Sequence, residues 1–228
     1  MKEKRVFYSE LSYLFGIIVL ALGTALMERA SFGMSMVVAP AYLIHLKVSE
    51  FLPFFSFGMS EYVFQAFLII VLSFAVGGFK KRFVFSFLTA IFYGFTLDLS
   101  MWVIGLIPAG GLLAQAIFFI LGLPVCSLGV ALLFQTYIPL CAYELFVLEI
   151  SKKFTLPLGK LKTVYDWCSC ILGILLSFSF FGFGKFVGIS WGTIVCALVN
   201  GWLIGIISSA LQKSFDFKDA LALRRFLS

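Results

Sequence analysis

The sequence predicts an all-α, polytopic helical membrane protein with six spanning helices and two short broken or re-entrant segments. Of its 228 residues, 62% are hydrophobic and 12% are charged, whereas a soluble domain is about 45–50% apolar and about 25% charged. This composition excludes a soluble enzyme, a nucleic-acid-binding domain and a disordered segment. The formal charge of +6 then bears on topology, because Lys and Arg gather on the cytoplasmic side of membranes.

Six apolar stretches are long enough to cross about 30 Å of hydrocarbon at 1.5 Å per residue. They are Leu11–Glu28, Glu61–Phe79, Phe83–Ile107, Gly111–Phe134, Val164–Phe183 and Val187–Leu211. The first stretch ends in Glu28-Arg29 without a small-residue cleavage site. It therefore indicates a spanning helix rather than a signal peptide.

Two further apolar stretches, Met34–Leu46 and Thr136–Ile150, are too short to span and contain Pro40 and Pro139. If both crossed, with the N-terminus inside, the basic cluster at 80–82 would lie outside. If both dip into the membrane and return, 14 of the 17 Lys and Arg residues lie inside. The positive-inside rule favours the second arrangement, with both termini in the cytoplasm.

An internal repeat divides the chain into halves at about 11–107 and 111–212. The matches are Ser86-Phe-Leu-Thr89 with Ser190-Trp-Gly-Thr193 at an offset of 104, and Gly16 and Gly23 with Gly122 and Gly129 at an offset of 106. Each half has long, short, long and long segments in the same order. Because each half would cross three times, the second half would be inverted, which gives a 3+3 inverted repeat.

The C-terminal segment 214–228 differs from the rest, since Phe and Leu alternate there with Asp, Lys and Arg. This pattern predicts a short amphipathic helix that lies on the cytoplasmic surface of the membrane as an anchor.

The two short segments predict the function. Paired short segments interrupted by Gly or Pro, in two inverted halves, indicate a transporter's central binding site. Non-helical backbone is tolerated at membrane depth only where protein covers it or where it lines a cavity. We therefore expect a secondary transporter or channel-like permease for an unidentified small solute, with Ser35 and Tyr42 shaping a pocket near the midplane.

Acidic residues within the apolar stretches are further candidates, because each costs about 2.5–3.5 kcal/mol to insert. Asp98 lies within about 5 Å of the midpoint of Phe83–Ile107 at 1.5 Å per residue. It either responds to a proton or cation, or pairs with Arg29 or with the backbone end of a broken helix. Glu144 lies in the second short segment and is either a proton or substrate site or a solvated interfacial residue.

Four other polar residues complete the candidate set for substrate binding. Glu28 and Arg29 end the first spanning stretch, where Arg29 either meets an anionic solute or extends to the outer headgroups. Glu61 and Gln65 are i, i+4 neighbours on one helix face. They either shape the pocket or lie at the outer surface.

No enzyme, metal or cofactor chemistry is expected. The five cysteines form no C-x-x-C pair and suit small buried apolar positions. His45 is the only histidine, and no Walker, dinucleotide-binding or H-E-x-x-H motif is present.

Four short segments contain glycine-based motifs: one that begins at Phe32-Gly-Met-Ser, Gly58-Met-Ser-Glu61, Ser86-Phe-Leu-Thr through Gly94-Phe-Thr-Leu-Asp98, and Gly192-Thr193 through Gly201. At these motifs the chain resembles the YczE/YyaS/YitT-type bacterial membrane proteins. The resemblance covers most of the chain and implies a multi-pass protein of the bacterial cytoplasmic (inner) membrane. Tyr137-Ile-Pro139 departs from the pattern, since a glycine-rich turn is expected there.

Two alternatives to a transporter stay open. The chain could capture a substrate as one subunit of a larger uptake complex, or it could organise lipid or assist a partner without transporting anything. Its expected partners are the lipid bilayer, a small-molecule or ion substrate, and a second copy or a partner membrane subunit. No nucleic-acid partner is expected.

Overall fold

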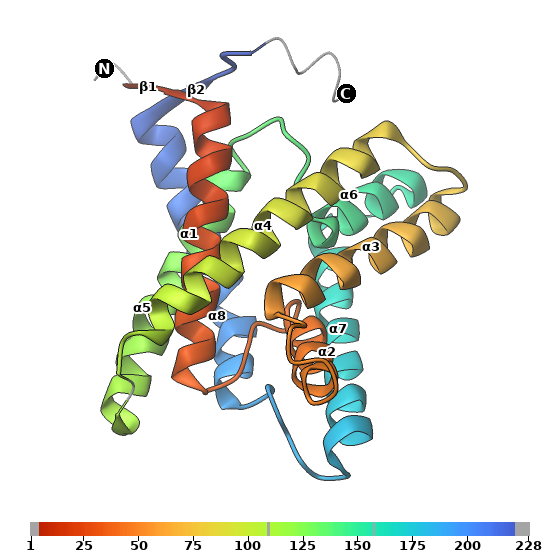
Figure 1. Ribbon diagram of the computed structural model, residues 1–228. Helices are drawn as coiled ribbons and strands as arrows, with labels where there is room; N and C mark the ends of the chain where they lie inside the picture. Colours follow the sequence, from red (N-terminus) through yellow and green to blue (C-terminus); the bar gives the residue numbers. More distant parts are fainter. Residues whose placement is uncertain (1–4, 109, 157, 222–228) are drawn as a thin grey trace.

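The computed structural model describes residues 5–108, 110–156 and 158–221, with residues 158–160 described as backbone only. These residues form eight helices and one two-stranded sheet (Figure 1). Six of the helices are long and apolar enough to cross a membrane, which confirms the predicted all-α membrane protein with six candidate spans. They are α1 (Ser9–Ala30), α3 (Phe57–Val76), α4 (Lys81–Gly105), α5 (Gly111–Leu133), α7 (Leu158–Phe181) and α8 (Trp191–Ser214).

The two short segments form short helices, α2 (Ala39–Ser49) and α6 (Ala142–Phe154). Each follows a stretch without α-helix, which we name the first break (residues 31–38) and the second break (residues 134–141). Pro40 lies in the first turn of α2, where its missing N–H leaves no helical hydrogen bond unmade. The helices therefore begin several residues later than the apolar runs that predict them.

Helices α1 and α5 form the most extensive contact among the described helices, and four glycines lie in it. A Cβ atom added to Gly23 would come closer than 3.0 Å to the backbone of Cys126, and one added to Gly129 would do the same at Leu20. Small residues let helix backbones approach closely in membranes. The order of these contacts makes the two helices antiparallel.

The two strands nearest the ends of the described chain lie side by side at one end of the molecule (Figure 1). Strand β1 (Arg5–Tyr8) pairs in parallel with strand β2 (Phe215–Lys218). The predicted amphipathic helix is therefore wrong for residues 215–218. Their apolar and polar residues alternate with a period of two, which suits a strand as soon as a partner is at hand. Residues 222–228 of the predicted helix lie outside the described residues.

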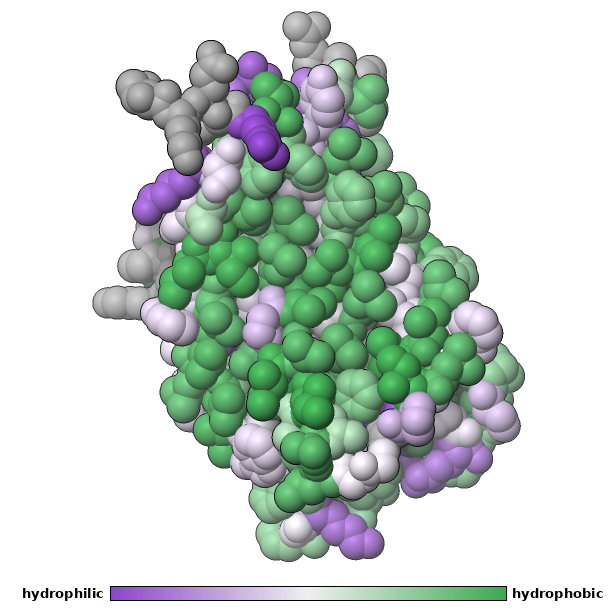
Figure 2. All heavy atoms as spheres, turned by 90° about the vertical axis from the view of Figure 1, so that its left-hand side faces the viewer, coloured by the Kyte–Doolittle hydropathy of each residue, from purple (hydrophilic) through white to green (hydrophobic). Residues whose placement is uncertain are grey.

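The outer surface suits lipid. Figure 2 shows a broad apolar face, with hydrophilic residues gathered mainly toward its upper and lower ends. Leu113 of α5 and Leu198 of α8 are 77% and 76% exposed. A soluble monomer rarely exposes a contiguous apolar patch of this extent, so this is the surface of a multi-pass membrane protein.

Candidate functional site

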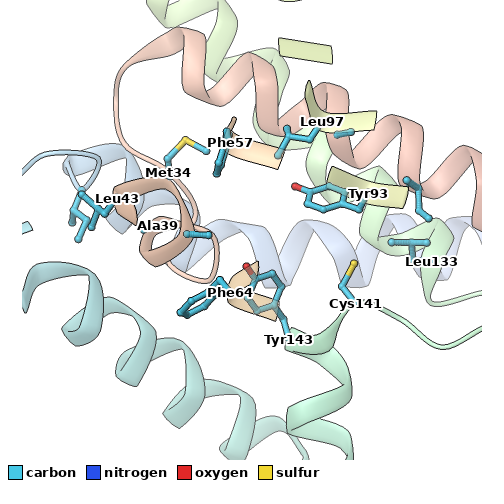
Figure 3. Close-up of a cluster of buried hydrophobic side chains, with 14 residues drawn as sticks. Met34, Ala39, Leu43, Phe57, Phe64, Tyr93, Leu97, Leu133, Cys141 and Tyr143 are labelled. Carbon is cyan, nitrogen blue, oxygen red and sulfur yellow. The ribbon is translucent and has the colours of Figure 1, made fainter. Parts of the chain in front are cut away.

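Both breaks contribute side chains to one buried cluster, which Figure 3 shows. The first break and α2 contribute Met34 and Ala39, and the second break and α6 contribute Cys141 and Tyr143. Helix α3 adds Phe64, which lies beside Tyr143. Segments more than 100 residues apart in the chain therefore contribute to the same buried cluster.

A polar group of three side chains, which we name the Glu61 site, ties α3 to the start of α6. The Tyr143 hydroxyl donates to Glu61 Oε2 at 2.7 Å, and Gln65 Nε2 donates to the same oxygen at 3.2 Å. The backbone N–H of Ala142 donates to Gln65 Oε1 at 2.9 Å. This N–H lies in the first turn of α6, where backbone N–H groups have no hydrogen-bond partner inside their own helix. Glu61 and Gln65 thus hold the helix that follows the second break.

Glu61 is fully buried, and one half of its carboxyl is unsatisfied. Its exposed fraction is 0%, and Oε1 has no hydrogen-bond partner among the described residues. No Lys or Arg of the described chain forms an ion pair with it. An isolated buried carboxylate is costly and is neutralised or paired instead. The Glu61 site can therefore hold a proton, or receive a cation or hydrogen-bond donor at Oε1.

Each break is also covered by a Ser-x-x-Thr sequence at the start of a spanning helix. In α4, Ser86 Oγ donates to the Leu140 carbonyl at 2.6 Å and Thr89 Oγ1 donates to the Pro139 carbonyl at 2.9 Å. These bonds satisfy backbone oxygens that the second break leaves outside a helix.

The first break is covered in the same way by α8. The N–H of Gly192 donates to the Phe32 carbonyl at 2.9 Å. Gly33 has a φ of +100°, and a Cβ atom on it would come within 2.5 Å of Thr193 Oγ1. Only glycine fits this position, because both the backbone angle and the close approach of α8 exclude a side chain.

A cavity of about 210 Å³ lies between the end of α1, the first break, α2 and the loop 182–190. Glu28 and Tyr42, both predicted as site residues, line it together with Ser31, Met34, Phe186 and Ser190. The Tyr42 hydroxyl lies 3.4 Å from Glu28 Oε1. We name this space the Glu28 cavity.

A protein-family model matches residues 7–209, which is most of the chain and includes both breaks, the Glu61 site and the Glu28 cavity. The chain belongs to DUF6198, a family of unknown function. The matched region of this DUF6198 protein contains α1 to α7 in full and most of α8. Neither a curated protein nor a solved structure matches the chain.

Asp98 of the DUF6198 chain lies apart from the Glu61 site. Its carboxylate accepts hydrogen bonds from the Ser56 hydroxyl and, at 2.8 Å, from the N–H of Gly58. Ser56 is the N-cap of α3, so Asp98 sits at the positive end of that helix. Of the two structural alternatives for Asp98, the structure therefore has the helix end and not the pair with Arg29.

The other predicted residues are dispersed. Arg29 donates to the Ile107 carbonyl at 2.8 Å at the protein surface. The Ser35 carbonyl accepts from the N–H of Ala39 and so begins α2. Glu144 is half-buried on α6, near the ion pair that Lys162 and Asp166 form at 3.0 Å on α7.

Sequence reasoning did not select Tyr143, although it donates the shorter hydrogen bond to Glu61. The useful signal was its position directly before Glu144 in a segment that follows a break.

Among the described residues of the DUF6198 protein, no group of three or more His, Cys, Asp or Glu residues could hold a metal ion.

Proposed function

We propose that the protein is a secondary transporter or channel-like permease for a small solute, with its site between the two breaks. The observation that carries this proposal is that both breaks contribute to one buried cluster, whose Tyr143 donates to the Glu61 carboxyl, and that this carboxyl is unsatisfied at Oε1. Intramembrane ionisable residues that face the protein interior mark substrate and ion pathways. Discontinuous helices near the midplane are typical transporter sites.

The glycine contacts between α1 and α5 support an inverted repeat. At the offset of 106, Gly16 corresponds to Gly122 and Gly23 corresponds to Gly129. In the structure Gly16 packs against Gly129, and Gly122 packs against Gly23. Such reciprocal contacts are those that a two-fold axis between equivalent surfaces requires.

The covered breaks support the same symmetry. Ser86 and Thr89 of the first half contact the second break, whereas their counterparts Ser190 and Thr193 of the second half pack on Gly33 in the first break. Each half therefore closes the break of the other, as two halves would do around a shared central site.

Contacts between basic segments support six spans with two re-entrant pieces. Lys80, next to α4, forms an ion pair with Glu149 of α6. Lys153 of α6 donates to the carbonyls of Ala75 and Val76 at the end of α3. If both short segments crossed the membrane, these two basic clusters would lie on opposite sides. Their contact agrees with a cytoplasmic position for both, together with the two termini.

Within this proposal, the Glu61 site is the central binding site and the Glu28 cavity is a second solute-contacting region. Asp98 supports α3, and Glu144 extends the polar path toward α7. The likeness to YczE/YyaS/YitT-type proteins further favours the bacterial cytoplasmic membrane as its location.

The test is solute uptake by the purified protein in liposomes. A panel of radiolabelled organic cations, organic anions, amino acids and sugars is offered under an imposed proton gradient and under a potassium diffusion potential. We expect at least one class to enter faster than into protein-free liposomes, with saturation as its concentration rises. If no class exceeds the protein-free rate while the reconstituted protein is folded, the proposal is wrong.

A further inference from the structure

We propose that the Glu28 cavity binds a small organic cation, either a protonated amine or a quaternary ammonium group, with Glu28 as its counter-charge. This inference rests on the proposed function and names the class of solute. The same chemistry occurs in a free solute and in an amine-bearing lipid headgroup.

The size of the cavity suits such an ion. Its volume of about 210 Å³ is several times the roughly 30 Å³ that one water molecule occupies in the liquid. It therefore has room for one small organic ion, or for the few water molecules that the ion would displace.

The charge of the cavity favours a cation. Glu28 is the one Asp, Glu, Lys, Arg or His among the described residues that line it. The neighbouring Arg29 does not line the cavity, and its guanidinium donates to the Ile107 carbonyl. Glu28 also lies in the last turn of α1, the end of a helix at which the backbone dipole is negative.

Two N–H groups at the positive end of a neighbouring helix are not free to bind an anion. Ser190, the N-cap of α8, lines the cavity. However, the N–H of Gly192 donates to the Phe32 carbonyl and that of Thr193 donates to the Ser190 carbonyl. These first N–H groups of α8 are therefore engaged within the protein and do not favour an anion.

The Glu28 carboxylate retains hydrogen-bonding capacity. Its contact with the Tyr42 hydroxyl is 3.4 Å, which is long compared with the usual 2.7–2.8 Å for O–H···O bonds. A protonated amine at this position would form a shorter, charge-assisted bond.

Aromatic rings supply the second element of cation recognition. Tyr42 and Phe186 line the cavity, and cations bind to the faces of such rings. The Tyr42 ring is held in place by Phe57, with ring centroids 5.2 Å apart, and by the close approach of Gly188. A carboxylate beside positioned rings is a suitable site for an ammonium group.

The cavity also borders the central site. Met34 lines the cavity and belongs to the buried cluster to which both breaks contribute, and Tyr42 packs against that cluster. A cation bound at Glu28 is therefore adjacent to the breaks that would have to move for it to reach Glu61.

The test uses the full-length protein in nanodiscs of phosphatidylglycerol, whose headgroup carries no amine, with tetramethylammonium chloride as the probe. We expect a saturable rise in melting temperature, beyond that produced by sodium chloride at equal ionic strength. The uncharged near-isostere tert-butanol should not reproduce it. Glu28→Gln should weaken the apparent affinity about tenfold or more, because the Coulomb attraction between the carboxylate and the cation is lost.

Two further variants keep the test informative. Tyr42→Leu removes the ring and should also weaken the affinity, so the inference does not depend on a single variant. Glu50→Gln is the matched control, because Glu50 is an exposed carboxylate paired with Lys47 outside the cavity. It should leave the affinity unchanged.

The lipid arm distinguishes the source of the amine. If phosphatidylethanolamine in the nanodiscs competes with tetramethylammonium, a headgroup shares the site, and if it does not, the site serves a free solute. Either result supports an amine site.

The absence of a saturable rise in melting temperature with tetramethylammonium, or equal affinities in the wild type and Glu28→Gln, would overturn the amine site. Uptake of another solute class without cation binding would leave the transporter proposal standing, whereas cation binding without any uptake would contradict only that proposal.

Discussion

A Glu61→Gln variant is expected to fold and to lose about tenfold or more of its uptake rate. Glutamine has the same shape as glutamate, and its carbonyl oxygen can still accept from Tyr143 and Gln65. It can neither bind and release a proton nor act as a counter-charge at the buried Oε1 position. The loss corresponds to about 1.4 kcal/mol or more in the transport barrier. Initial uptake rates in liposomes, for a solute that the wild type transports, measure it.

The control for this variant is Glu50→Gln, the same chemical change at an exposed carboxylate. Its uptake rate should equal that of the wild type. Melting temperatures of all three proteins in nanodiscs separate a transport defect from a folding defect. A Glu61→Gln protein that is folded and transports at the wild-type rate would remove the Glu61 site from the proposed mechanism.

The second large effect is expected in Gly23→Val, which should lower the free energy of unfolding by about 3 kcal/mol or more. The added side chain would overlap the backbone of Cys126 in α5. A backbone cannot move aside as a flexible side chain can, so the α1–α5 contact would have to separate. The change is measured as a fall in melting temperature and in the folded fraction that survives detergent extraction.

Gly201→Val is the matched control, since Gly201 lies within α8 and an added Cβ atom would meet nothing within 4 Å. It experiences the same change in helix propensity without the steric overlap. If the two variants were equally stable, close packing of α1 on α5 would not be the reason for the glycine at position 23.

The spanning helices could be predicted from the sequence because their signals are local. Length and apolar composition identify a span, and a short apolar run with a proline identifies α2 and α6. Residues 215–218 could not be assigned in this way, because their strand depends on β1, which lies more than 200 residues away in the chain. An amphipathic sequence of this kind suits either structure until its partner is known.

The candidate site was predictable only in part. The i, i+4 spacing of Glu61 and Gln65 correctly predicts that they face the same way, and the two are in contact. By contrast, the position of Asp98 along its apolar stretch predicts only that it is the carboxylate deepest in the membrane. Its partners Ser56 and Gly58 lie some 40 residues earlier, and the turn that brings them to Asp98 leaves no local pattern. The contact between Tyr143 and Glu61 also joins residues far apart in the chain, so no local pattern predicts it.

The central claim is that two inverted halves enclose a site between their breaks, and its most direct test is the side on which the basic segments lie. Single cysteines replace the exposed residues Lys81, Lys152 and Lys185 in turn, in a chain whose Cys168 and Cys170 are alanine. With a membrane-impermeant maleimide, position 185 should react in intact cells, whereas positions 81 and 152 should react only after permeabilisation. Reaction of position 81 in intact cells would contradict the inverted six-span arrangement.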